Sequence, residues 1–72
     1  MYSDNDILRQ LGRNIKAERI RIGLTQEKFA ELYGCDKDYI SKIECGKQNL
    51  SMKKIVKIAN CLRCDLEILL KF

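Results

Sequence analysis

The chain has 72 residues, 46% of them hydrophobic, and a formal net charge of +4. This is the composition of a small globular protein, and no apolar run approaches the ~20 residues that a membrane span requires. The N-terminus is acidic and polar, and it lacks the layout of a signal peptide. The sequence therefore predicts a single cytoplasmic domain over residues 1–72, with a core over about residues 7–70 and no contact with a membrane.

The first two thirds of the chain predict three helices separated by glycines. Apolar residues at helical spacing cover about residues 6–22, with Arg19 in the same stripe. A second helix is expected up to Tyr33, and a third begins after residue 36. The residues expected to cap or end these helices are Gly23, Thr25, Gly34, Asp36 and Gly46. The inward positions are expected to be Leu8, Leu11, Ile15, Ile22, Phe29, Ala30, Tyr33, Ile40, Ile43 and Glu44.

The remainder of the chain predicts two further helices and no strand. Ser51 is placed to cap a helix whose inward residues, at offsets of three and four, are Met52, Ile55, Ala59 and Leu62. Asp65 is placed to cap a short last helix from Leu66 to about Lys71. Every connection is short, so the expected fold is an all-α, compact five-helix domain.

Residues 25–46 have the features of a helix-turn-helix, in which two short helices meet at a turn that contains glycine. Gly34 stands at the turn, and Ala30 is small where the two helix axes would come closest. Residues 37–57 also carry a net charge of +4, equal to that of the whole chain. A basic segment of this kind favours a polyanionic partner, while an ordinary solvated face is the alternative.

The four cysteines are Cys35, Cys45, Cys61 and Cys64. The C-x-x-C spacing of the last two raises the possibility of zinc or thiol chemistry. Histidine is absent and the other two cysteines form no second C-x-x-C pair, which argues against a zinc site. Free cysteines pack as small apolar residues, so three of them are expected at the margin of the core. The sequence predicts no metal and no cofactor.

Three segments in combination resemble the lambda-repressor-like family, also called the Cro/C1 or Xre family. They are RIRIGLTQEKFA at 19–30, YISKIECGK at 39–47 and NLSMKKIVKIA at 49–59. The resemblance covers about residues 11–70 and implies five helices with operator binding by the third. Cys45 departs from the family, which often has arginine or asparagine there, and this change could remove a phosphate contact.

The outward residues of the third helix are predicted to read bases, and they are Lys37, Asp38, Ser41 and Lys42. A helix fits the major groove, where lysine donates to guanine and aspartate accepts from cytosine N4. Gln26 begins the second helix, where its side chain and free backbone N–H groups could meet a phosphate. The resemblance implies the same phosphate-binding role for Tyr39, Lys47 and Asn49.

Two other features predict internal and intermolecular contacts. Arg19 and Glu44 each interrupt an apolar stripe, and an unpaired buried charge is costly, so they are expected to form a structural ion pair. The last helix can hide only one stripe. Ile68, Phe72 and an edge of Leu70 would then lie outside, and they predict a homodimer interface.

The function predicted from these features is a sequence-specific DNA-binding regulator of transcription. It would act as a dimer on a near-palindromic operator and would block, or help to recruit, RNA polymerase. The small size and the YISKIE pattern most resemble the restriction-modification controller proteins of the family. A DNA-binding antitoxin of a toxin–antitoxin pair is the alternative. No constellation of catalytic residues is present, so an enzyme is not expected.

Overall fold

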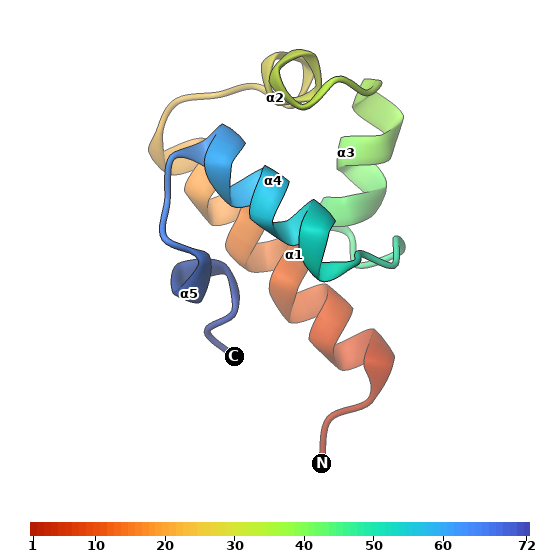
Figure 1. Cartoon of the computed structure of the whole chain (residues 1–72). Helices are drawn as coiled ribbons and strands as arrows, with labels where there is room; N and C mark the ends of the chain where they lie inside the picture. Colours follow the sequence, from red (N-terminus) through yellow and green to blue (C-terminus); the bar gives the residue numbers. More distant parts are fainter.

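The computed structural model describes the whole chain, residues 1–72, and contains five α-helices and no strand (Figure 1). They are α1 (Asp4–Arg21), α2 (Gln26–Tyr33), α3 (Lys37–Glu44), α4 (Met52–Leu62) and α5 (Leu66–Leu69). The predicted all-α, five-helix fold is thereby confirmed. α1 is the long central helix, and it contacts α3, α4 and α5.

The expected caps form at three of the helices. The side chains of Thr25, Asp36 and Ser51 each accept a hydrogen bond from the backbone N–H three residues further on. Asp65 makes no such bond, and α5 ends at Leu69, earlier than the sequence predicted.

α1 starts at Asp4, two residues before its predicted start. Ser3 and Asp6 form a reciprocal capping box there, which satisfies backbone N–H groups that the first turn leaves without partners. The hydrogen bonds from Ser3 also hold the pKa of the Asp6 carboxyl below its ordinary value.

The core is one apolar cluster to which every helix contributes. Its buried members are Leu11, Ile15, Phe29, Ala30, Tyr33, Ile40, Ile43, Ile55, Ile58, Ala59, Leu62 and Leu69. Two predicted core positions lie outside this cluster, because Met52 is 56% exposed and Leu8 on α1 is only half-buried. Met52 is the first residue of α4, and the buried stripe of that helix begins three residues later with Ile55 and includes the fully buried Ile58.

α1 and α3 approach each other closely at a glycine. A Cβ atom on Gly12 would lie 2.5 Å from the carbonyl oxygen of Ile43 and 2.6 Å from that of Glu44. Real Cβ atoms do not come so near to backbone oxygens, so any other residue would push the two helices apart. Gly12 therefore allows α1 to support the C-terminal end of α3 directly.

A buried ion pair joins the same two helices. The Arg19 guanidinium donates from Nε to Glu44 Oε2 at 2.7 Å and from Nη2 to Glu44 Oε1 at 3.2 Å. Both residues are only 8% exposed. Arg19 also donates from Nη1 to the Leu24 carbonyl oxygen at 2.7 Å. The bidentate geometry and the third bond satisfy most of the guanidinium without water.

Arg19→Ala and Glu44→Ala are each expected to lower the free energy of unfolding by about 3–5 kcal/mol, because each leaves the other charge buried and unpaired. Replacing both residues with apolar ones of similar volume should cost much less. Urea denaturation of the single and double variants measures this, and a coupling energy near zero would contradict the account. Lys28→Ala is the matched control, since Lys28 pairs with Glu31 at the surface, where both side chains are more than half exposed, and it should change stability by less than about 1 kcal/mol.

Candidate nucleic-acid interface

The turn between α2 and α3 depends on Gly34. Gly34 caps α2 with φ 93°, in the left-handed region that other residues rarely adopt. Its N–H and that of Cys35 both donate to the Ala30 carbonyl oxygen, at 2.8 and 3.0 Å. Asp36 then caps α3, so the chain leaves one helix and enters the next within three residues. The two helices pack against each other and α3 lies at one side of the molecule (Figure 1).

α3 has one anchored face and one free face. Ile40, Ile43 and Glu44 are buried against the rest of the protein. The residues on the free face are Lys37, Asp38 and Lys42, which are exposed, and Ser41, which is half-buried. Their side chains make no hydrogen bond or ion pair within the protein. The structure thus presents a row of unpartnered polar groups on a helix whose other side is fixed.

Gln26 connects this surface to the buried ion pair. Its Nε2 donates to Glu44 Oε1 at 3.0 Å, and its amide oxygen keeps its acceptor capacity. The backbone N–H groups of Gln26 and Glu27 have no partner in the protein, since both lie in the first turn of α2. Unpaired N–H groups at the start of a helix attract anions. The hydrogen bond from Gln26 to Glu44 was not predicted from the sequence, where no spacing relates the two residues.

The other candidate phosphate contacts lie on α3 and in the loop that follows it. Lys47 and Asn49 are exposed in the loop between α3 and α4. Tyr39 is half-buried on α3, and its ring centroid is 5.9 Å from that of Tyr33. Lys54 lies over the Tyr39 ring at 5.9 Å. The structure therefore places basic or polar groups before and after the row on α3.

Lys57 was not singled out from the sequence, yet it belongs to this aromatic cluster. Its Nζ lies 4.2 Å from the centre of the Tyr33 ring, within the range of a cation–π contact. Burial raises the pKa of Tyr33 to about 12, so its hydroxyl stays protonated at neutral pH. The Lys57 contact thus joins α4 to α2, and Tyr33 and Lys54 both lie next to the Tyr39 ring in the first turn of α3.

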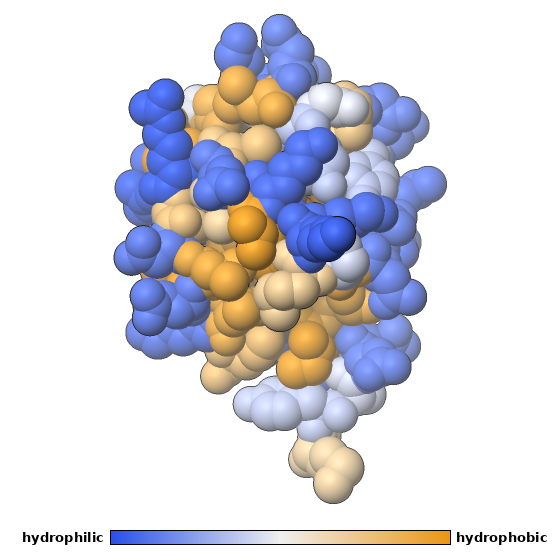
Figure 2. All heavy atoms as spheres, viewed as in Figure 1, coloured by the Kyte–Doolittle hydropathy of each residue, from blue (hydrophilic) through white to orange (hydrophobic).

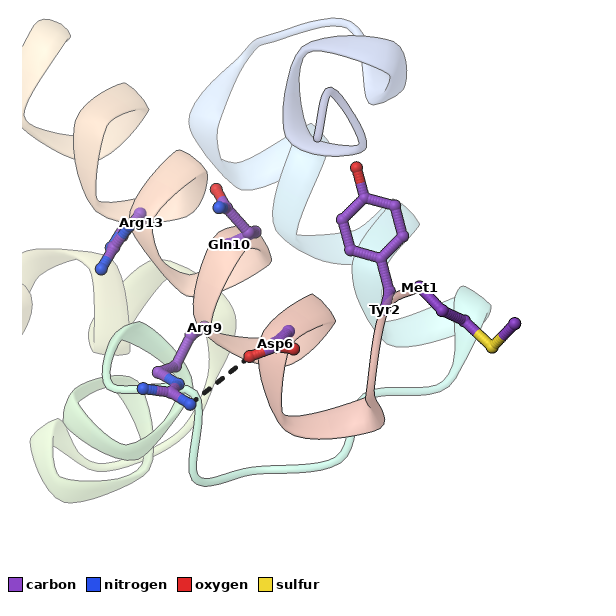
Figure 3. Close-up of a pocket in the computed structure, with 6 residues that line it drawn as sticks. All are labelled: Met1, Tyr2, Asp6, Arg9, Gln10 and Arg13. Atoms are coloured by element: carbon purple, nitrogen blue, oxygen red, sulfur yellow. Dashed lines mark ion pairs between the residues drawn. The ribbon is translucent and has the colours of Figure 1, made fainter.

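The remaining surface offers no comparable constellation. A side-chain hollow near the N-terminus is open to solvent and is lined by Met1, Tyr2, Asp6, Arg9, Gln10 and Arg13 (Figure 3). Arg9 is paired there with Asp6 at 3.5 Å, and Tyr2 points away from both (Figure 3). No group of three or more metal-ligating side chains comes together. No helix is long and apolar enough to span a membrane.

The cysteines are all free thiols. Burial raises the pKa of Cys35, Cys61 and Cys64, which lowers the thiolate fraction at neutral pH. These three pack against the core, as predicted, whereas Cys45 is exposed at the end of α3. A raised pKa is the opposite of what a reactive cysteine needs.

Two short helices joined at a left-handed glycine, with a free polar face on the second, define a helix-turn-helix protein. The chain belongs to the HTH_3 helix-turn-helix family, whose family model matches residues 15–69. This family is of the Xre and Cro/C1 type, so the resemblance found in the sequence is confirmed.

The similar proteins include several controllers of restriction-modification systems. The control protein C.MunI from Mycoplasma sp is 39% identical over 56 residues, which cover 76% of each chain. The crystal structure of the restriction-modification controller protein C.AhdI from Aeromonas hydrophila superposes with a TM-score of 0.86 at 31% identity, over 94% of this chain and 99% of that one. The controller protein C.Esp1396I gives a TM-score of 0.79 at 33% identity, over 90% and 88% of the two chains.

Proposed function

We propose that the protein is a sequence-specific transcriptional regulator of the controller type, which binds a near-palindromic operator as a homodimer and catalyses no reaction. The observation that carries the proposal is the row of unpartnered polar side chains on the free face of α3. A polar side chain without an internal partner is free to bond with a base edge, and the buried face of α3 fixes the direction in which the row points. The similarity to controller proteins supports the regulatory role.

In the proposed complex α3 lies in the major groove. Lys37 and Lys42 would donate to guanine O6 and N7, and Asp38 would accept from cytosine N4. Asp38 is the informative member, because a carboxylate facing phosphates would only weaken binding. Ser41 is half-buried and reaches less far than the lysines.

Phosphates would be held on the two sides of that row. The first turn of α2 would bind one through the free backbone N–H groups of Gln26 and Glu27 and the second N–H of the Gln26 side-chain amide. Lys47 and Asn49, in the loop after α3, would bind phosphates on the other side, and Tyr39 would contribute from α3. Such contacts fix the register on the duplex but carry little sequence information, and each one steepens the salt dependence of binding.

Lys37→Ala and Lys42→Ala are expected to reduce discrimination between a specific and a scrambled duplex, by about 1–3 kcal/mol for a good base contact. Lys47→Ala should weaken binding to both duplexes about equally. Competition binding at fixed salt measures the difference. Equal losses on both duplexes for all three variants would overturn the assignment of roles.

Arg21→Ala provides the control for charge alone. Arg21 is nine residues after Gly12 on α1, so at 100° per residue it lies on the side of the helix opposite to α3. The Arg21→Ala substitution removes one positive charge, as each of the lysine variants does. It should therefore affect neither the discrimination nor, beyond a small long-range effect, the affinity.

The proposed dimer interface is an apolar surface over α4 and α5. Ile68 is 42% and Phe72 45% exposed, and Leu70 between them is half-buried. Met52 and Val56 on the neighbouring α4 are also exposed, although the sequence did not assign them to an interface. Figure 2 shows apolar side chains gathered over α4 and α5 on this face. Exposed apolar surface of this kind commonly marks an association site.

A two-fold dimer would match the geometry of DNA. Two recognition helices about 34 Å apart read half-sites one helical turn apart, and the symmetry of the dimer makes the operator near-palindromic. Bound at a promoter in the cytoplasm, such a dimer would act through occupancy, by blocking RNA polymerase or by helping to recruit it.

Sedimentation at micromolar concentration is expected to give about twice the monomer mass of 8.4 kDa. Ile68→Asp combined with Phe72→Asp should return the protein to a folded monomer and weaken operator binding, because charges would replace the apolar contacts. Leu32→Asp is the control, since Leu32 is an apolar residue on α2 that is slightly more exposed than Ile68 and Phe72 and lies outside the proposed surface. A wild-type monomer that binds one half-site tightly would defeat the dimer.

A further inference from the structure

One polar contact ties the C-terminal segment to the middle of α1. The Asn14 side chain donates from Nδ2 to the carbonyl oxygens of Leu69 and Lys71, both at 2.9 Å. The two N–H bonds of the amide are thus used on two acceptors that lie on either side of Leu70. Only the NH₂ end of the amide can do this, since its oxygen would be repelled by both carbonyls.

α5 needs support from the rest of the protein because few hydrogen bonds within the helix itself stabilise it. It contains four residues, and its N-cap Asp65 makes no side-chain hydrogen bond. A helix of this length is not stable in isolation. Leu69 is fully buried and Leu66 and Leu70 pack against the core beside it, but these apolar contacts do not orient the backbone carbonyls at the end of the segment. The two bonds from Asn14 fix the directions of the carbonyls that follow.

Those carbonyls belong to the residues next to the proposed dimer contacts. Leu69 follows Ile68 directly, and the Lys71 carbonyl is part of the peptide bond to Phe72. When the two carbonyls are fixed, the backbone from Leu69 to Phe72 keeps one direction relative to Ile68 on α5. Asparagine is also a poor helix former, so its place in the middle of α1 favours a specific role for the side chain.

We infer that Asn14 is a positioning residue for self-association. It holds the C-terminal segment so that Ile68 and Phe72 form one preorganised surface for a second copy of this chain. The inference rests on the proposed dimer. A preformed surface loses less conformational entropy on association, so Asn14 strengthens the dimer without touching the partner.

The test compares dimer dissociation constants, measured by sedimentation under conditions where circular dichroism shows every variant fully folded. Asn14→Leu removes both donors, and Asn14→Asp keeps the shape but replaces the donors with a charge that the carbonyls repel. Each is expected to raise the dissociation constant by about tenfold or more. Asn5→Leu is the matched control, because Asn5 lies exposed on the same helix without a hydrogen bond, and it should leave the constant unchanged.

The outcomes separate this inference from the dimer itself. A wild-type monomer at all concentrations would overturn both. A wild-type dimer with folded Asn14 variants that dimerise as tightly would overturn the role of Asn14 alone. If Asn14→Leu fails to fold, Asn14→Ser, which retains one donor, takes its place under the same criterion. Unfolding of that variant as well would show that the amide supports the whole fold, and would also overturn the inference.

Discussion

The arrangement of the helices depends on the buried pair between Arg19 and Glu44. Arg19 comes from the end of α1 and Glu44 from the end of α3, and the carboxylate also accepts a hydrogen bond from Gln26 at the start of α2. The same guanidinium holds the Leu24 carbonyl oxygen in the loop that leads into α2. Four parts of the chain therefore meet at one pair of charges, and a buried charge tolerates little displacement from its partner. The orientation of α3 and the start of α2 are set together.

α1 links the two surfaces through which the protein is proposed to act. Gly12 faces α3, and Asn14 binds the C-terminal segment. Gly12 and Asn14 are two positions apart, which is about 200° around the helix at 100° per residue, so these contacts lie on nearly opposite sides of α1. The proposed DNA-reading helix and the proposed dimer surface are thus both fixed to one rigid element. In a dimer, this connection would set the separation of the two recognition helices.

Much of the fold could be predicted from the sequence, because caps, glycines and apolar spacing are local signals. Thr25, Gly34, Asp36 and Ser51 marked the ends of helices correctly. What failed depends on tertiary position, as with Met52, which has the spacing of a core residue but lies at the edge of the core.

The same limit applies to the candidate site. The outward row on α3 follows from helical periodicity alone. Three contacts could not be predicted, because they join residues far apart in the sequence and leave no local pattern. They are the bond from Gln26 to Glu44, the cation–π contact of Lys57 with Tyr33, and the bonds from Asn14 to the C-terminal segment.

The measurement that tests the central claim most directly is the selection of duplexes from a random pool by the purified protein at low salt. The account predicts enrichment of a near-palindromic sequence with half-sites about one helical turn apart. A pool that remains random after repeated selection would contradict it.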